Sequence, residues 1–213
     1  MTSVRLILWR HGLTGWNAES RFQGQLDPPL SETGVAEAEK AAELLAAMSP
    51  SLLVSSDLQR AQQTAAALAE RTGLAVHTDE RLRERHWGDW QGKTHAELAE
   101  HDSEAFAMWQ AGRQPTVNGR EDPDAVRTRV AAAIRSAVTR VSDVTEATVI
   151  LVSHGGAIRY GLAELLRWPE ELARTVSGLH NCHWAQLRTR PVVSSDAPDE
   201  WVLSAYNVGA ATP

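Results

Sequence analysis

Short apolar runs alternate with longer segments of helical periodicity along this chain. Four runs have the length and composition of buried strands, at residues 4–9, 52–55, 74–77 and 148–153. In other segments apolar residues recur every three or four positions, which predicts helices at residues 31–48, 57–71, 124–141 and 155–166. This alternation predicts a doubly wound α/β fold, with a mainly parallel sheet that carries helices on both faces.

Polar and small residues mark where several of these elements begin and end. Ser31 and Asp57 stand where two helices start, and both residue types commonly cap helix N-termini. Gly73 follows the second helix, at a position where glycine often ends one. Residues 184–187 and 201–205 predict two more short strands separated by a polar loop, which we expect to pair antiparallel at one edge of the sheet.

A less regular stretch interrupts the alternation between about residues 79 and 122. It contains two short helical segments and a polar loop over residues 112–123. Insertions of this kind often form a lid or side wall over a binding site. We therefore predict that residues 1–213 form a single domain, with a helical cap inserted at about residues 79–122.

Composition and charge narrow the classes of function. With 43% hydrophobic and 23% charged residues, the chain has the composition of a soluble globular domain. Its net charge of −6 argues against nucleic-acid binding, which requires a basic surface. The lone Cys182 cannot form an internal disulfide, the N-terminus lacks a signal peptide, and no apolar run approaches the ~20 residues of a membrane span. These features predict a cytoplasmic protein without nucleic-acid or membrane partners.

Charged residues gather at the ends of the predicted strands. Arg10-His11-Gly12 follows the first run and His154-Gly155-Gly156 follows the last, so each strand ends in a histidine and a glycine. Arg60 comes shortly after the second strand, and Glu84 after the third. The carboxyl ends of parallel strands meet at one edge of a sheet, so we expect two arginines, two histidines and one glutamate to share a crevice.

This set of side chains fits phosphoryl transfer. A neutral His11 can attack phosphorus through a ring nitrogen and form a phosphohistidine. Arg10 and Arg60 offer planar guanidinium groups that match phosphate oxygens. A protonated His154 would stabilise the charge of the transition state. Glu84 is the remaining proton carrier, able to protonate the leaving alkoxide and then to activate water.

Two further groups are candidates for phosphate binding. The backbone N–H of Gly155 opens a helix, a position that favours anions, and Asn17 can donate another hydrogen bond. The chemistry needs no metal or other cofactor, and no spacing is typical of a zinc or magnesium site. His180 and His183 stand near Cys182, but no second ligand pair accompanies them, so ordinary solvated or buried side chains are favoured there.

Five motifs occur in a fixed order: Arg10-His11-Gly12-x-Thr14-x-x-Asn17, Leu30-Ser31-x-x-Gly34, Ser55-Ser56-Asp57-Leu58-x-Arg60-Ala61-x-x-Thr64-Ala65, Leu82-x-Glu84 and Ser153-His154-Gly155-Gly156. In this order they resemble the histidine phosphatase superfamily, the phosphoglycerate mutase-like clan. The resemblance covers nearly the whole chain and implies a phosphohistidine on His11, with Glu84 as acid and base. It also implies a phosphate pocket formed by Arg10, Asn17, Arg60 and His154, and lined by Gln23 and Gly24 of a matching loop.

The same resemblance leaves a choice between hydrolysis and isomerisation. Phosphoglycerate mutases carry a longer basic insertion with a paired arginine, and residues 93–113 have no Arg-Arg pair. The thinner basic cap favours a phosphatase that acts on a small phosphorylated metabolite. A mutase is the alternative. An inactive phospho-ligand-binding protein is disfavoured because His11 and Glu84 are both present.

Among the phosphatases of this superfamily, residues 21–27, 55–58 and 88–96 are similar to the glucosyl-3-phosphoglycerate phosphatases. Arg120 and Asp122 depart from the pattern, since glycine and serine are usual there. Arg120 either reaches a substrate carboxylate or is a solvated loop charge. The cap tryptophans, Trp87, Trp90 and Trp109, either face a sugar ring or pack the insertion. The exact substrate stays open, as does the oligomeric state, although an apolar C-terminal strand edge is compatible with a homodimer.

Overall fold

The computed structural model describes residues 3–189 and 201–210, and a six-stranded sheet forms its centre. The strands are β1 Ser3–Arg10, β2 Leu52–Ser55, β3 Val76–Thr78, β4 Glu146–Ser153, β5 Trp184–Thr189 and β6 Trp201–Val208. Their order is β3-β2-β4-β1-β5-β6, and the first four run parallel. β5 pairs antiparallel with β1 and with β6, so the predicted antiparallel pair at the edge is confirmed. The predicted polar loop between these two strands lies outside the described residues.

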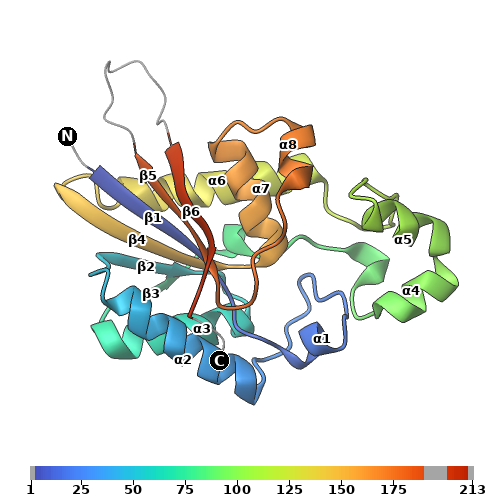
Figure 1. Ribbon diagram of the computed structural model, residues 1–213, viewed down its shortest axis with the longest axis horizontal. Helices are drawn as coiled ribbons and strands as arrows, with labels where there is room; N and C mark the ends of the chain where they lie inside the picture. Colours follow the sequence, from blue (N-terminus) through green and yellow to red (C-terminus); the bar gives the residue numbers. More distant parts are fainter. Residues whose placement is uncertain (1–2, 190–200, 211–213) are drawn as a thin grey trace.

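Helices cover both faces of this sheet (Figure 1). The α-helices of the described residues are α1 Gly15–Ala18, α2 Glu32–Ala46, α3 Gln59–Thr72, α4 His95–His101, α5 Ser103–Gln110, α6 Pro123–Thr139, α7 Gly155–Leu165 and α8 Glu170–Thr175. α2 and α3 pack on one face, and α6 and α7 on the other, which confirms the doubly wound α/β prediction. Of the helices described, none is long and apolar enough to cross a membrane.

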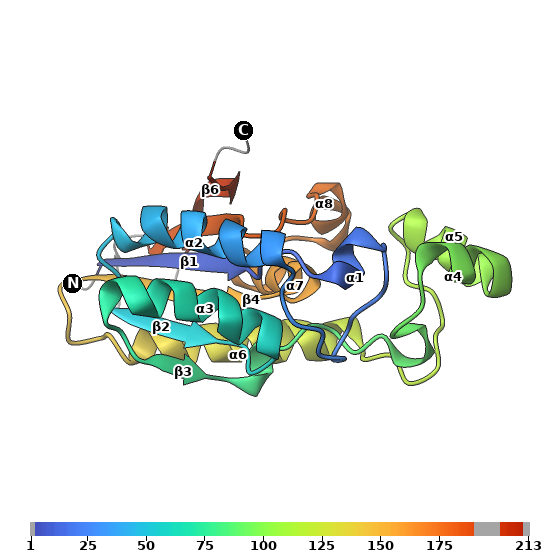
Figure 2. The same cartoon turned by 90° about the horizontal axis from the view of Figure 1, so that it is seen from below.

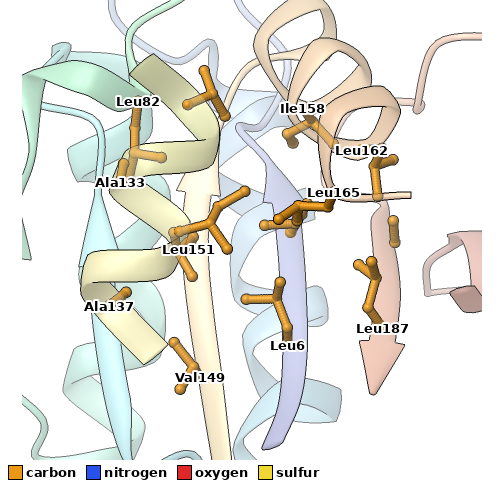
Figure 3. Close-up of a cluster of buried hydrophobic side chains, with 14 of the residues drawn as sticks. Leu6, Leu82, Ala133, Ala137, Val149, Leu151, Ile158, Leu162, Leu165 and Leu187 are labelled. Carbon is orange, nitrogen blue, oxygen red and sulfur yellow. The ribbon is translucent and has the colours of Figure 1, made fainter. Parts of the chain in front are cut away.

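The two cores follow from the alternation of side chains along β1. Leu6 and Leu8 point into the cluster with α6 and α7, whereas Ile7 and Trp9 point into the cluster with α2 and α3. Figure 3 shows the first cluster, where Leu162 and Leu165 of α7 lie toward β5 and β1, and α6 with Ala133 and Ala137 lies on the side of β2 and β4. A strand that is apolar on both faces explains why residues 6–9 read as one continuous hydrophobic run.

Most of the predicted helix boundaries are confirmed, and one cap is wrong. Ser31 caps α2, because its Oγ accepts from the Gly34 N–H at 3.1 Å, and Gly73 ends α3 with φ +73°. Asp57 does not cap α3, whose N-cap is Leu58 without a side-chain hydrogen bond. The Asp57 carboxylate binds the Arg83 guanidinium through two oxygens instead, which also lowers its pKa.

Two differences from the helical pattern concern short or terminal segments, whereas α4 and α5 are the two short helices predicted for the insertion. The spacing puts Val35 on the apolar face of α2, but it is 44% exposed because it lies in the first turn, beyond the sheet. The short helices α1 and α8 have no apolar periodicity that would predict them. α4 and α5 lie beyond the carboxyl end of β1 (Figure 2), joined to the rest of the chain through 3₁₀ turns at Glu80–Leu82 and Gly88–Trp90.

Candidate active site

Three neighbouring strand ends bring the two histidines together. The His11 N–H donates to the Ser153 carbonyl at 3.0 Å, so the chain leaves β1 directly beside the end of β4. His154 follows at once, and its ring centre is 5.1 Å from that of His11. On the other side of β4, the Ser56 N–H donates to the Val152 carbonyl at 2.9 Å. The parallel register therefore brings together residues that are more than 140 positions apart.

His11 is buried, and its tautomer is fixed by the backbone. Its Nδ1 is 2.8 Å from the carbonyl oxygen of Gly12, which can only accept a hydrogen bond. The ring proton is therefore on Nδ1, and Nε2 keeps a free lone pair. Burial, and then the charges of Arg60 and Arg10, lower the pKa of His11 well below its usual value, so the ring is neutral at pH 7.

Two buried guanidinium groups lie close enough to His11 to affect its charge. Arg10 donates through Nη1 to the Leu179 carbonyl at 2.6 Å, and Arg60 donates to the carbonyls of Leu26 and Gly24 at 2.8 and 2.7 Å. Burial lowers the pKa of Arg10 and lowers that of Arg60 to about 10, so both stay charged at pH 7. Their carbonyl bonds fix both side chains while leaving Nε of each without a partner.

His154 is neutral in the ligand-free protein, so the condition of a protonated ring, on which its suggested role depended, is not met there. Burial, followed by the charge of Arg60, lowers its pKa well below the usual histidine value. Nε2 is 2.9 Å from the Ser56 hydroxyl, and Nδ1 is buried without a partner. The sequence places this histidine at a strand end but gives no measure of how completely the site excludes water.

The carboxylate of Glu84 binds the N-terminus of α7. Its carboxylate accepts from the N–H groups of Gly156 at 3.0 Å, Ala157 at 2.9 Å and Arg85 at 2.8 Å. A Cβ at residue 156 would lie 2.6 Å from Glu84 Oε1, which explains the glycine there. Two N–H groups of this helix terminus therefore bind Glu84, and the preceding residue, Gly155, lines the cavity described below.

The three loop residues expected in the pocket also lie at this site. Asn17 Oδ1 accepts from the Thr14 N–H at 3.1 Å and the Thr14 hydroxyl at 3.0 Å, which leaves its amide nitrogen for a ligand. Gln23 is buried, with its Oε1 unpartnered. Gly24 has φ +54° and packs against Gln91, a conformation and a contact that exclude a larger side chain.

These side chains surround a cavity of about 730 Å³. It is lined by residues from the strand ends, the 17–24 loop and the cap, among them Arg10, His11, Asn17, Gln23, Gly24, Arg60, Glu84 and Gly155. Seven buried side-chain polar atoms in the described part of the chain lack a hydrogen-bond partner. Four belong to residues that line the cavity, namely Arg10 Nε, Gln23 Oε1, Arg60 Nε and Arg85 Nη2, and a fifth, His154 Nδ1, belongs to the ring beside His11. Unpaired buried donors are rare in proteins, and the three guanidinium nitrogens among these atoms indicate a site for an anion with several oxygens.

Known proteins of the same fold agree with this chemistry. The sequence model of the histidine phosphatase superfamily (branch 1) matches residues 6–195. The chain belongs to the histidine phosphatase superfamily. A glucosyl-3-phosphoglycerate phosphatase of Mycobacterium tuberculosis is 40% identical over an alignment of 220 residues, which covers 99% of this chain and 97% of the relative.

Two further comparisons bear on fold and reaction. A probable phosphoglycerate mutase of Yersinia pestis is 34% identical, over 98% of this chain and 92% of its own. A solved mycobacterial glucosyl-3-phosphoglycerate phosphatase in complex with VO3 superimposes with a TM-score of 0.86 at 40% identity, covering 96% of this chain and 99% of that one. The chain is thus a phosphoric monoester hydrolase, and the higher identity of the phosphatases supports hydrolysis over the mutase alternative.

Sequence reasoning missed several residues that line the cavity of this histidine phosphatase. Arg85 is buried on the far side of Glu84 and donates to the Tyr160 hydroxyl at 2.9 Å and to Gln114 at 3.0 Å. Arg113 and Arg159 line the same cavity without an ion pair in the described part of the chain. Arg85 directly follows Glu84, and Arg159 stands three residues after Gly156, which is the signal that could have found them.

Arg120 and Asp122 lie away from this cavity. Arg120 lines a smaller cavity of about 310 Å³ between α6, α7 and α8, which shares Gln114, Arg159 and Tyr160 with the larger one. Asp122 caps α6, because its Oδ1 accepts from the Asp124 N–H at 2.8 Å. The departure from glycine and serine at these positions therefore changes the base of the cap and the start of α6.

The cap is held by an aromatic cluster centred on a residue of the 17–24 loop. Phe22 lies 5.0 to 5.1 Å from Trp87, Trp90 and Trp109 between ring centres. Trp90 is buried and donates to Asp102 at 2.7 Å, so it packs the insertion. Trp87 and Trp109 line the cavity, and the loop and the cap therefore form one wall.

Other candidate groups of this histidine phosphatase have ordinary surroundings. Cys182 is buried, and burial raises the pKa of its thiol, which fits a small packing residue. His180 and His183 form a T-shaped pair. Throughout residues 3–189 and 201–210, no three histidine, cysteine or acidic side chains gather as a metal site.

Proposed function

We propose that this histidine phosphatase hydrolyses glucosyl-3-phosphoglycerate through a phosphohistidine on His11. The observation that carries the proposal is the His11 ring, whose Nδ1 is held by the Gly12 carbonyl so that the Nε2 lone pair is free beside Arg10 and Arg60. A neutral nucleophile approaches a phosphate dianion without charge repulsion, and the two guanidinium groups attract the same dianion.

In the first half-reaction, the Nε2 lone pair of His11 attacks phosphorus, and the bond between phosphorus and the ester oxygen breaks. Arg10, Arg60, Asn17 and the Gly155 N–H bind the phosphoryl oxygens. Protonated Glu84 gives its proton to the leaving alkoxide and becomes a carboxylate. This carboxylate is stabilised by the N–H groups that already hold Glu84 at the start of α7.

In the second half-reaction, the Glu84 carboxylate takes a proton from water while the water oxygen attacks phosphorus. The bond between phosphorus and Nε2 breaks, and the electron pair returns to the ring. His11 is neutral again, inorganic phosphate leaves, and Glu84 is protonated for the next cycle. These steps need no oxidant or metal.

The cavity supports a substrate with a carboxylate and a sugar. Arg85, Arg113 and Arg159 add positive charge beyond the phosphate-binding arginines, and Arg85 Nη2 is buried without a partner. Trp87 and Trp109 present aromatic rings to the same space, and such rings stack on sugar faces. At about 730 Å³ the cavity has the size of typical small-molecule sites. The mycobacterial relatives are named as glucosyl-3-phosphoglycerate phosphatases, and this supports glucosyl-3-phosphoglycerate as the substrate.

A substrate panel and a trapping experiment test the proposal. We expect fastest release of inorganic phosphate from glucosyl-3-phosphoglycerate, slower release from 3-phosphoglycerate and sugar phosphates, and no formation of 2-phosphoglycerate. Quenching in alkali after incubation with labelled substrate should trap protein-bound phosphate that is released by acid, and His11→Ala should trap none. Turnover of His11→Ala at the parent rate would contradict the mechanism, and net conversion of 3- to 2-phosphoglycerate would support the mutase.

A further inference from the structure

Ser56 stands just past the end of β2, with its hydroxyl against the second histidine of the site. Its Oγ lies 2.9 Å from Nε2 of His154, and both side chains are fully buried. The proposed reaction gives this hydroxyl no role. Because a neutral imidazole has one N–H and one lone pair, the direction of this hydrogen bond decides what the other ring nitrogen can do.

The surroundings of Ser56 indicate which partner donates. Its Oγ accepts a long hydrogen bond from the Leu58 N–H at 3.4 Å, and the Ser55 hydroxyl donates to the Ser56 carbonyl at 2.8 Å. Among the described residues, His154 Nε2 is the group within hydrogen-bond distance that can take the Ser56 proton. If Nε2 accepts, the ring proton is on Nδ1.

We propose that Ser56 is a positioning residue, which donates its hydroxyl proton to His154 Nε2 and thereby holds the ring as the Nδ1–H tautomer. Nδ1 is buried without a partner, and the ring centre is 5.1 Å from that of His11. The Nδ1–H is then available to an oxygen of the phosphoryl group. This inference rests on the proposed role of His11 as phosphoryl acceptor.

The arrangement explains how a neutral histidine serves the reaction. Burial and the charge of Arg60 keep the pKa of His154 low, so a free imidazolium is absent at pH 7. With the Nδ1–H tautomer in place, His154 donates one hydrogen bond without first taking up a proton. The opposite tautomer would direct a lone pair at the phosphoryl oxygens and repel them.

The ¹⁵N chemical shifts of the histidine rings test the tautomer in the wild-type protein. Long-range ¹H–¹⁵N correlation spectra distinguish protonated from unprotonated ring nitrogens, and His154→Gln identifies the signals of His154 among the eight histidines. We expect Nδ1 protonated and Nε2 unprotonated in phosphate-free buffer at pH 7. A proton on Nε2, or on both nitrogens, would overturn the proposal.

Kinetics of two serine variants test the consequence. By analogy with the outer partners of metal-bound histidines, whose loss costs about 10- to 100-fold, we expect Ser56→Ala to lower kcat by a similar factor, with a smaller change in KM. The matched control is Ser55→Ala, which removes an equally buried hydroxyl that does not contact His154. It should keep both the His154 spectrum and the rate. An unchanged kcat in folded Ser56→Ala would contradict the positioning role.

The two proposals fail in different ways. If the wild-type protein released no phosphate from any phosphomonoester, the function would be wrong, whereas the tautomer would still be read from the ligand-free spectrum. If the protein is an active phosphatase but His154 carries its proton on Nε2, the positioning role of Ser56 fails alone. Should Ser56→Ala not fold, the wild-type spectrum still decides.

Discussion

The two buried histidines should make the protein lose stability in mild acid. His11 and His154 both have a folded-state pKa well below the ordinary value of 6.5, caused first by burial and then by Arg60. As the pH falls below 6.5, these histidines take up protons in the unfolded chain but not in the folded protein. Each therefore contributes stability that is present above pH 6.5 and is lost as the pH falls toward the folded-state pKa.

The size of the loss follows from the linkage relation. Between pH 7 and pH 5, a histidine that titrates at 6.5 when unfolded and stays neutral when folded costs about 2 kcal/mol. Both histidines together cost about 4 kcal/mol, a large part of the stability of a typical domain. Carboxylates such as Asp57 also contribute to the loss of stability in acid. Their contribution is the same in the wild type and in a histidine variant, so it cancels when the losses of the two proteins are compared.

Urea unfolding at pH 7 and pH 5, in phosphate-free buffer, measures this difference. The double variant His11→Asn with His154→Gln should lose about 4 kcal/mol less than the wild type over this range, whatever its absolute stability. The control is His101→Gln on the cap, whose side chain is 69% exposed, and it should behave as the wild type. Equal losses in the wild type and the double variant would refute the assignment of neutral, buried histidines.

Three further predictions concern the site. Glu84→Gln should lower kcat for glucosyl-3-phosphoglycerate by about 10²- to 10⁴-fold, and with p-nitrophenyl phosphate, whose leaving group needs no acid, it should accumulate phosphohistidine that alkaline quenching detects. Arg159→Gln should lower kcat/KM for glucosyl-3-phosphoglycerate about 10- to 100-fold but leave p-nitrophenyl phosphate unchanged, while Arg127→Gln, which lines only the smaller cavity, should alter neither. Inorganic phosphate at about 100 times its Kd should raise the free energy of unfolding of the wild type by about 2.7 kcal/mol in the same assay. Reversing the charge of Arg60 should abolish this stabilisation, and reversing the charge of Arg127 should not. The opposite result would contradict the assigned site.

The sequence predicted the parts of the site that depend on strand ends. His11 and His154 directly follow two neighbouring parallel strands. The alternation of strands and helices along the chain predicts a parallel sheet, and in such a sheet residues that follow the strands lie at the same edge. The tautomer of His11 depends on one backbone carbonyl, and the neutral state of His154 depends on complete burial. Neither property is encoded in a local pattern, since both arise from what the rest of the fold places around the ring.

The failures have a common physical cause, which is competition between partners distant in sequence. Asp57 has the residue type of an N-cap, but a bidentate bond to Arg83 is stronger than a capping bond to the backbone. Phe22 anchors the cap although it belongs to a loop more than 60 residues earlier.

A histidine is suited to position 11 because the pocket must stay positive to hold a phosphate. The Arg10 and Arg60 guanidinium groups make hydrogen bonds to neutral carbonyls, and the one ion pair between them and a carboxylate in the described residues, from Arg60 to the half-exposed Asp27, is 3.7 Å long. A carboxylate nucleophile at residue 11 would pair with them, and it would repel each phosphate charge by about 4 kcal/mol at 4 Å for an effective dielectric constant near 20. The carboxylate that the reaction requires, Glu84, is held instead by backbone N–H groups of α7. Separating the neutral nucleophile from the anionic proton carrier lets one pocket attract phosphate and still hold a base for water.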